Sequence, residues 1–211
     1  MRIAGVILAG GLARRMGGGD KALLSLAGRP LLGHVIDRLA PQVETVVLNA
    51  NGDPDRFAPF ALPVVADTVE GFAGPLAGVL AAMRWAAPQG ITHVASAAAD
   101  TPFFPTDYVA QLAAALTAET PIAMAATVEP KRGLGEHPTF ALWPVDLADD
   151  LEDALTRGGL RKIIVWASRH GIARVEFAGD RQFFNVNTPE DLAEAEGIAA
   201  ARAGLGEGSA A

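Results

Sequence analysis

The chain begins with IAGVILAGGLARRMGGGDKALL (residues 3–24), the stretch that decides how the rest is arranged. Its first part, residues 3–8, is a continuous apolar run typical of a buried strand. The strand runs into a loop that holds five glycines, two arginines and Lys21. Backbone N–H groups of a glycine-rich loop can approach an anion closely, and cationic side chains neutralise its charge. The stretch therefore predicts a site for a phosphate-bearing ligand, most simply a nucleotide.

The loop matches neither of two common phosphate-binding patterns. A P-loop needs Gly directly before its Lys and Ser or Thr directly after it, whereas Lys21 stands between Asp20 and Ala22. A dinucleotide fingerprint begins where the strand ends, but the literal match from Gly17 to Ala22 starts nine residues after Leu8. The sequence thus indicates another kind of phosphate site, with a plain surface loop as the alternative.

Length and composition indicate a globular protein. A chain of 211 residues can bury roughly 70% of its unfolded surface. The absence of cysteine excludes disulfides and thiolate chemistry and fits a reducing compartment. A net charge of -7 argues against general binding to nucleic acid. Because no signal peptide or membrane-spanning run is visible, we expect a cytoplasmic protein with neither nucleic acid nor membrane as a partner.

Predicted strands and helices alternate along the first half of the chain. The strands occupy residues 3–8, 43–48, 63–66 and 92–98. The helices, each with one apolar face, occupy residues 32–39, 75–83 and 109–116. Such alternation implies right-handed crossovers and a parallel sheet with helices on both faces, which is the α/β class.

The second half is less regular. Strands are predicted at 122–128 and 139–143, separated by a polar turn, so they form either a hairpin or an antiparallel edge. Helices are predicted at 145–156 and 160–167, and a last strand at 173–177. The motif Thr188-Pro189-Glu190-Asp191 combines a cap, a first-turn proline and acids at the positive end of a helix. We therefore expect a final helix to begin there.

Polar residues follow the ends of the predicted strands. The glycine loop follows the first strand, residues 49–53 the second, Asp67 the third and Asp100 the fourth. In an open parallel sheet, ligands bind beyond the carboxyl ends of the strands. We expect these residues to meet in one cleft.

Asp100 is the sharpest candidate among the carboxylates. It closes the run 94–99, which is uncharged, and no cation stands near it in the sequence. Magnesium is usually held by one or two carboxylates together with substrate phosphates, which would let Asp100 lie beside a triphosphate. The alternative is that Asp100 only caps the turn before Pro102. Asp67 either contacts a ribose or base or simply ends its strand.

Two further sets of residues are candidates for the same cleft. His137 lies beside the basic turn 131–132 and could contact a phosphate or substrate, although a lone His is more often structural. Asn185 and Asn187 are two positions apart, so their amides point the same way on an extended segment. The pair either lines the cleft with Asp100 or doubles the cap of the last helix.

Taken together, these motifs resemble the nucleotidyltransferases that build nucleotide-linked metabolites, and specifically the molybdenum cofactor guanylyltransferases. The matching motifs, in order within residues 3–192, are Leu8-Ala9-Gly10-Gly11, Arg15-Met16-Gly17, Asp20-Lys21-Ala22, Gly74-Pro75-Leu76-Ala77-Gly78, Asp100-Thr101-Pro102, His137-Pro138 and Asn185-Val186-Asn187-Thr188-Pro189. The resemblance implies a Rossmann-like three-layer sandwich, mostly parallel, with an antiparallel element in the second half. We expect one domain over residues 1–199, with a nucleotide-binding half (1–104) and an acceptor-binding half (105–199), and a flexible tail over residues 200–211.

The resemblance also implies a reaction. The terminal phosphate of molybdenum-loaded molybdopterin attacks the α-phosphorus of GTP, and pyrophosphate leaves. The implied catalytic residues are Arg15, Lys21 and Asp100, with Mg²⁺ on Asp100 as the cofactor. The implied nucleotide-binding residues are Leu8, Ala9, Gly10, Gly11, Lys21, Asn49, Asp67, Gly78 and Asp100. The implied acceptor-binding residues are His137, Asn185 and Asn187, and molybdoenzymes or cofactor-insertion proteins are the further partners.

Three other interpretations stay open. The sister cytidylyltransferase uses CTP; Gly11 and the stretch 74–76 resemble the guanine-selective branch, but a few loop contacts decide base choice. Many sugar-1-phosphate nucleotidyltransferases carry a further domain, for which 211 residues leave no room. A nucleotide- or cofactor-binding protein without catalysis would have little need for Lys21 and Asp100 together.

Overall fold

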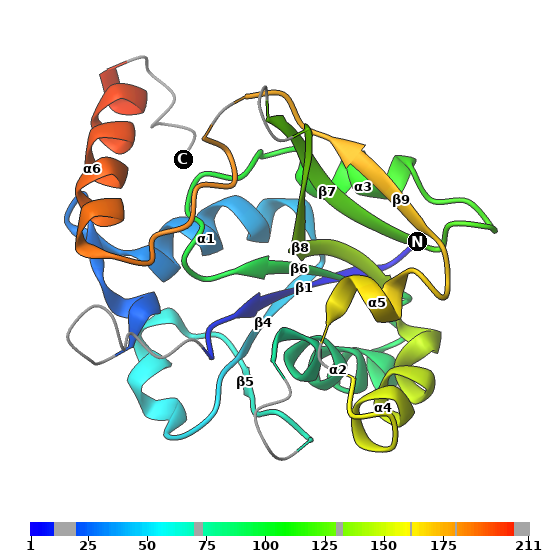
Figure 1. Ribbon diagram of the computed structural model, residues 1–211. Helices are drawn as coiled ribbons and strands as arrows, with labels where there is room; N and C mark the ends of the chain where they lie inside the picture. The colour runs from blue at the N-terminus through cyan, green and yellow to red at the C-terminus, as the bar shows by residue number, and fades with distance from the viewer. Residues whose placement is uncertain (11–19, 70–73, 130–132, 161, 180, 205–211) are drawn as a thin grey trace.

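A computed structural model of the chain describes residues 1–10, 20–69, 74–129, 133–160, 162–179 and 181–204. Within this part, seven strands form one sheet in the order β5-β4-β1-β6-β8-β7-β9 (Figure 1). They are β1 (Ile3–Leu8), β4 (Thr45–Asn49), β5 (Val64–Val65), β6 (His93–Ala98), β7 (Ile122–Glu129), β8 (Gly133–Pro144) and β9 (Ile172–Glu176). Neighbouring strands are parallel except around β8, which is antiparallel to both β6 and β7. The predicted α/β class, mostly parallel with an antiparallel element, is confirmed.

Six α-helices occur in the same described residues. They are α1 (Leu31–Leu39), α2 (Pro75–Ala86), α3 (Tyr108–Ala114), α4 (Ala148–Thr156), α5 (Ile163–Ala167) and α6 (Pro189–Gly204). Short 3-10 helices are η2 (Lys21–Leu23), η3 (Ala40–Gln42), η4 (Pro54–Phe60), η5 (Ala87–Gln89) and η6 (Val145–Leu147). A small hairpin joins β2 (Ser25–Leu26) to β3 (Arg29–Pro30).

The helices cover both faces of the sheet (Figure 1). On one face, α2, α4 and α5 enclose a core that includes Trp143 and Trp166, whose ring centroids are 6.0 Å apart. On the other face, α1 and α3 pack around Phe104, Tyr108 and Phe140. The apolar stripes predicted for residues 32–39 and 75–83 face these two cores, so the three-layer sandwich is as predicted.

The buried hydroxyl of Tyr108 fastens α3 to the central strand β6. It donates to the Ser96 carbonyl at 2.6 Å, and the Trp143 indole donates to the Ser96 hydroxyl at 2.8 Å from the other side. Burial raises the pKa of the Tyr108 hydroxyl well above its ordinary value because the phenolate would lose its hydration. The hydroxyl therefore stays protonated and remains a donor, which holds the strand that leads into Asp100.

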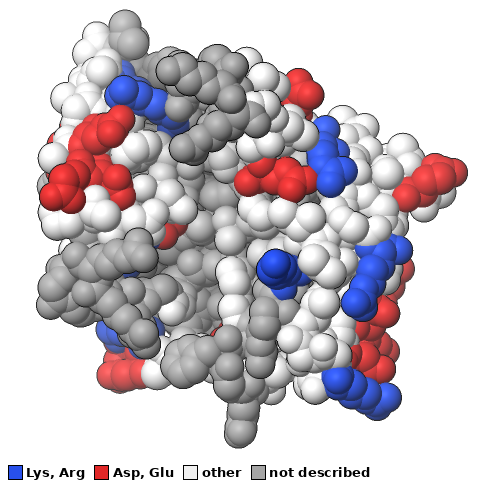
Figure 2. All heavy atoms as spheres, in the orientation of Figure 1, with Lys and Arg blue, Asp and Glu red and all other residues white. Residues whose placement is uncertain are grey.

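Paired charges on the surface join α2 to α4. Figure 2 shows basic and acidic side chains side by side over the region of α4, at the lower right. There Arg84 of α2 contacts the carboxylates of Asp149, at 2.6 Å, and Glu152. Such exposed pairs contribute little to stability, typically below about 1 kcal/mol each.

Two features differ from the sequence expectations. The strands β7 and β8 form the predicted hairpin, but β8 lies inside the sheet between β6 and β7, and β9 is the edge strand. After β6 the chain passes through α3 to β7, which is not the neighbour of β6 in the sheet. The next strand, β8, then lies between β6 and β7. The last helix continues to Gly204, past residue 200 where we expected the tail to begin. Ile198 is buried against the β2–β3 region, and Arg202 donates to the Phe103 carbonyl at 3.3 Å, which together hold this final turn.

Strand register brings the carboxyl ends of the parallel strands level with one another. Leu8 is paired with Asn49 of β4 and with Ala98 of β6, and Asn49 is paired with Val65 of β5. Residues that follow these four strands must therefore meet at one edge. None of the helices in the described residues is both long and apolar enough to cross a membrane.

Candidate functional site

A cavity of about 300 Å³ opens at the carboxyl ends of the parallel strands. This is the place where open α/β sheets bind their ligands. The cavity brings together six residues that the sequence predicted: Leu8, Gly10, Asn49, Asp67, Asp100 and Asn185. It is completed by five residues that were not singled out as site residues: Asn51, Gly74, Pro75, Ala98 and Thr139.

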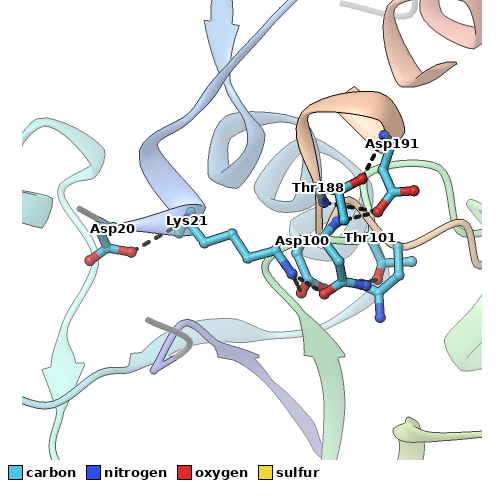
Figure 3. A network of polar contacts seen from close by, with 9 residues as sticks. Asp20, Lys21, Asp100, Thr101, Thr188 and Asp191 are labelled. Carbon is cyan, nitrogen blue, oxygen red and sulfur yellow. Dashed lines mark hydrogen bonds and ion pairs between the residues drawn. The ribbon is translucent and has the colours of Figure 1, made fainter. Parts of the chain in front are cut away.

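Lys21 reaches from η2 to the end of β6 (Figure 3). Its ammonium forms an ion pair with the Asp100 carboxylate and donates to Asn187 Oδ1 at 2.5 Å. The Lys21 and Asp100 side chains are 11% and 21% exposed, so water and salt screen the pair only weakly. The cation that the sequence did not place near Asp100 thus comes from a position 79 residues earlier in the chain.

Thr101 and Asn185 orient the Asp100 carboxylate from the other side. The Thr101 hydroxyl donates to Asp100 Oδ1 at 3.2 Å. With its amide nitrogen turned toward the carboxylate, Asn185 donates to Asp100 and to the Thr101 hydroxyl, which is 2.9 Å away. The backbone N–H of Val186 donates to the Asp100 carbonyl at 2.9 Å. Asp100 is therefore engaged by side chains and is not merely the cap of a turn.

The start of α6 is capped without help from the two asparagine side chains. Asp191 Oδ2 accepts from the backbone N–H groups of Asn187 and Thr188 at 2.8 and 2.9 Å. The Thr188 hydroxyl accepts from the Asp191 N–H at 3.2 Å, a reciprocal capping arrangement (Figure 3). The cap that the sequence predicted at Thr188 is confirmed. This cap uses neither asparagine side chain, because Asn185 contacts Asp100 and Asn187 contacts Lys21. The alternative that the two asparagines double the helix cap is therefore wrong.

The opposite wall of the cavity is an amide–carboxylate cluster. Asn49 donates to Asp67 Oδ1 at 2.9 Å, and Asn51 donates to Asp67 Oδ2 at 2.8 Å. The Asn51 side-chain oxygen in turn accepts from the Asp67 N–H at 2.9 Å. The Asp67 carboxylate is therefore fixed by neutral donors, and both of its oxygens face polar partners at the cavity wall.

Gly78 does not line the cavity but makes room for this cluster. A Cβ at position 78 would lie 2.1 Å from Asn49 Oδ1 and 2.7 Å from Leu8 Cδ2. The Asn49 amide donates to Asp67 and to the Val65 carbonyl, so moving it away from such a Cβ would disturb these contacts. Gly78 in α2 thus allows close packing of the helix against the ends of β1 and β4.

We expect Gly78→Ala to weaken nucleoside triphosphate binding and to lower stability. The clash should cost about 1–3 kcal/mol of unfolding free energy, which outweighs the helix preference for Ala. Urea unfolding and ligand titration measure the two effects. Gly197→Ala is the matched control, because a Cβ there meets nothing within 4 Å. Unchanged binding in Gly78→Ala would contradict this role for the glycine.

Some predicted site residues lie elsewhere. Ala9 is buried, and its N–H donates to the Asn49 carbonyl at 2.9 Å, so it supports the cavity wall from behind. His137 stacks on Phe183 with ring centroids 4.4 Å apart and shares a hydrogen bond of 2.9 Å with the Thr127 hydroxyl. It is two residues from Thr139, on the same strand, but is not among the cavity-lining residues. Gly11 and Arg15 lie outside the described residues.

Among the described residues, the cavity offers charge and hydrogen bonds, and its lining contains no Ser, Cys or His side chain. Its described lining residues include two carboxylates, three amides and the hydroxyl of Thr139. The Lys21 ammonium forms an ion pair with one of the carboxylates, Asp100. Among the described residues, no group of three or more His, Cys, Asp or Glu could hold a metal by itself. The described set carries one more negative than positive charge, so a bound polyanion would need a further cation beside it.

A cation brought by a phosphate ligand fits this donor set. Mg²⁺ is commonly bound by one or two carboxylates, with the rest of its shell filled by substrate phosphates and water. Asp100 provides one carboxylate at the cavity, already oriented by Thr101 and Asn185. The residues present therefore fit a metal that arrives with its ligand rather than a metal caged by protein alone.

Thr139 and Asn51 carried little signal in the sequence. Thr139 lies in β8, where the residues that follow it in the sequence are apolar. It lies beside the cavity because β8 is placed next to β6 in the sheet. Asn51 belongs to the polar stretch 49–53, from which the family pattern singles out Asn49 alone. Only the pairing with Asp67 identifies Asn51.

Comparison with known proteins gives consistent results. Residues 5–173 match the family described as MobA-like NTP transferase domain. A molybdenum cofactor guanylyltransferase of Bradyrhizobium sp. (strain ORS 278) is 53% identical over 94% of this chain and 93% of its own length. One from Rhodopseudomonas palustris (strain BisB5) is also 53% identical, over 92% of each chain. The crystal structure of molybdopterin-guanine dinucleotide biosynthesis protein A from Archaeoglobus fulgidus superposes with a TM-score of 0.70 at 25% identity, covering 95% of this chain and 100% of that one.

Proposed function

The chain belongs to the family of MobA-like NTP transferases, and from this membership we propose that it is a molybdenum cofactor guanylyltransferase. Its relatives carry that name over nearly their whole length, at about 50% identity. The reaction transfers GMP from GTP to molybdopterin and releases pyrophosphate. The observation that carries the proposal at the level of geometry is the contact of Lys21 with Asp100 and Asn187 beside a cavity at the strand ends.

In the reaction we propose, both substrates lie in the cavity. An oxygen of the terminal molybdopterin phosphate forms a bond to the α-phosphorus of GTP. The bond from that phosphorus to the oxygen bridging to the β-phosphate breaks, and pyrophosphate leaves with the electron pair. Catalysis of such transfers rests on positioning and on neutralising charge around the phosphorus. The described lining of the cavity contains no Ser, Cys or His, which suits this chemistry.

Lys21 is the side chain that we propose to neutralise the triphosphate. Its ammonium is held at the cavity by Asp100 and Asn187, so its position is set before any ligand binds. A buried ammonium aimed at a phosphate acts more strongly than one in water because the local dielectric is low. We propose Arg15 for the same purpose, on the strength of the family pattern.

Asp100 is the residue that we propose to hold Mg²⁺. Magnesium bound there together with the triphosphate would neutralise negative charge at the phosphate oxygens. Thr101 and Asn185 would hold the carboxylate in place for this task, and Asn187 gives Lys21 a contact of its own besides Asp100.

The acceptor, we propose, enters past Thr139 and Asn185. These two residues line the cavity on the side of β8 and of the segment before α6. His137 is further along the same strand, and residues two apart on a strand share a face. The wall formed by Asn49, Asn51 and Asp67 is then left for the nucleoside.

The test offers each nucleoside triphosphate in turn, with Mg²⁺ and molybdenum-loaded molybdopterin, and follows pyrophosphate release. We expect release with GTP and formation of the guanine dinucleotide product. Release with CTP alone would favour the cytidylyltransferase. Binding of nucleotide and acceptor without release would favour a binding protein, and omission of Mg²⁺ tests the cofactor.

A further inference from the structure

Arg56 connects two loops on one side of the cavity. Its Nε donates to Asp20 Oδ2 at 2.7 Å, and its Nη2 donates to the Asn51 carbonyl at 2.7 Å. A third donation goes from Nη1 to the Asp53 carbonyl. The guanidinium carbon lies 4.4 Å from the centre of the Phe57 ring, and Phe57 is buried in the core under α1. Arg56 is thus anchored in η4 and reaches the residue that precedes Lys21.

Asp20 stabilises the start of η2, but its carboxylate also carries a negative charge next to Lys21. Its Oδ1 caps η2 by accepting from the Ala22 N–H at 3.2 Å, and this fixes the backbone of Lys21. Its side chain is only 15% exposed, so little water screens its charge. Asp20 and Lys21 point in opposite directions from adjacent positions (Figure 3).

The charges around the cavity explain why Asp20 needs a partner. Asp100 is paired with Lys21, and Asp67 is held by two neutral amides. An unpaired Asp20 beside Lys21 would repel a triphosphate and compete for the ammonium. In the structure, Arg56 donates to Asp20 Oδ2, and the other carboxylate oxygen, Oδ1, makes the η2 cap.

We propose that Arg56 is a positioning residue for triphosphate binding that acts by cancelling the charge of Asp20. This inference rests on the proposed function, because it requires the cavity to bind a nucleoside triphosphate. Arg56 does not line the cavity and need not touch the ligand. Its effect passes through Asp20, which keeps the lysine backbone capped without adding a free negative charge.

A purely structural role for Arg56 makes a different prediction. If the residue only braced the loop through the carbonyls of Asn51 and Asp53, its loss would be harmful whether or not Asp20 is charged. If it cancels the Asp20 charge, neutralising that carboxylate should remove the need for it. Asp20→Asn is suited to this purpose because Asn is as good a helix cap as Asp.

The experiment measures the Kd of Mg·GTP by calorimetry, and KM and kcat by pyrophosphate release, for four proteins. These are the wild type, Arg56→Ala, Asp20→Asn and the double variant. We expect Arg56→Ala to raise Kd and KM about tenfold with kcat within about threefold of wild type, as for loss of a charge partner in uniform binding. The double variant should bind within about threefold of Asp20→Asn, since the two changes act on one interaction.

Controls separate this inference from folding and from the proposed function. Arg84→Ala removes an arginine with two carboxylate contacts at the far end of α2, and should leave Kd unchanged. Arg56→Gln keeps donors for the loop carbonyls and loses the charge, so it replaces Arg56→Ala if that variant does not fold. A double variant as weak as Arg56→Ala, or a wild-type Kd in Arg56→Ala, would overturn the inference alone. A wild-type protein that binds no nucleoside triphosphate would overturn the proposed function as well.

Discussion

Asp100→Asn is expected to lower kcat by roughly 10³-fold or more, since a carboxylate that holds a catalytic cation is worth several kcal/mol in the transition state. The amide has nearly the same shape as the carboxylate, and the Val186 N–H still reaches the backbone carbonyl of residue 100. Lys21 keeps its contact with Asn187. We therefore expect the protein to stay folded, with the free energy of unfolding changed by less than about 2 kcal/mol.

Pyrophosphate release at several Mg²⁺ concentrations and urea unfolding measure the two parts of this prediction. Asp107→Asn is the matched control, because Asp107 lies in the same β6–α3 region, accepts from Gln111 and is not among the described lining residues of the cavity. Turnover near the wild-type rate in Asp100→Asn would show that this carboxylate is not needed for catalysis. Loss of folding would instead indicate a structural role.

Lys21→Met is expected to lower kcat by about 10²–10³-fold and to weaken GTP binding. Methionine fills much of the space of the lysine stem, so the change removes mainly the ammonium. The Asp100 carboxylate then keeps only the Thr101 hydroxyl and the Asn185 amide as described partners. An unopposed carboxylate at the cavity should also repel the triphosphate, so both kcat and KM are affected.

Single-turnover kinetics and GTP titration distinguish these two effects. Lys162→Met, at the exposed start of α5, removes a lysine that is outside the cavity and should change neither. Lys21→Arg keeps the charge, but the planar guanidinium has a different shape and a different hydrogen-bond pattern. Full activity in Lys21→Met would show that the ammonium is not needed for the transfer.

Much of the sheet could be predicted because its signals are local. The apolar runs of β1 and β6 are long enough to be recognised alone, and the motif Gly74-Pro75 marks the start of α2 directly. The place of β8 inside the sheet could not be predicted, since it depends on pairing with strands distant in sequence. The two-residue strands β2 and β3 are too short to produce any periodic pattern.

The sequence pointed to some of the residues around the cavity but not to their contacts. Lys21, Asp100 and Asn187 each stand in a recognisable motif, yet nothing in the sequence states that they touch one another. Arg56 is not among the predicted residues, because it follows the polar stretch 49–53 and lies in the 3-10 helix η4, which was not predicted from the sequence. Its importance follows from geometry alone, namely from the side chain of Asp20 at 2.7 Å.

The contact between Lys21 and Asn187 spans 166 positions, and this has a consequence for how the protein is made. A ribosome delivers the glycine loop before Asp100, and Asp100 before the asparagine pair. Chains begin to fold from the N-terminus during synthesis, so β1, β4 and β6 can assemble while the site still lacks Asn185 and Asn187. A nascent chain, or one cut short by a premature stop codon before residue 185, therefore carries the phosphate-attracting residues without the partners that fix their positions.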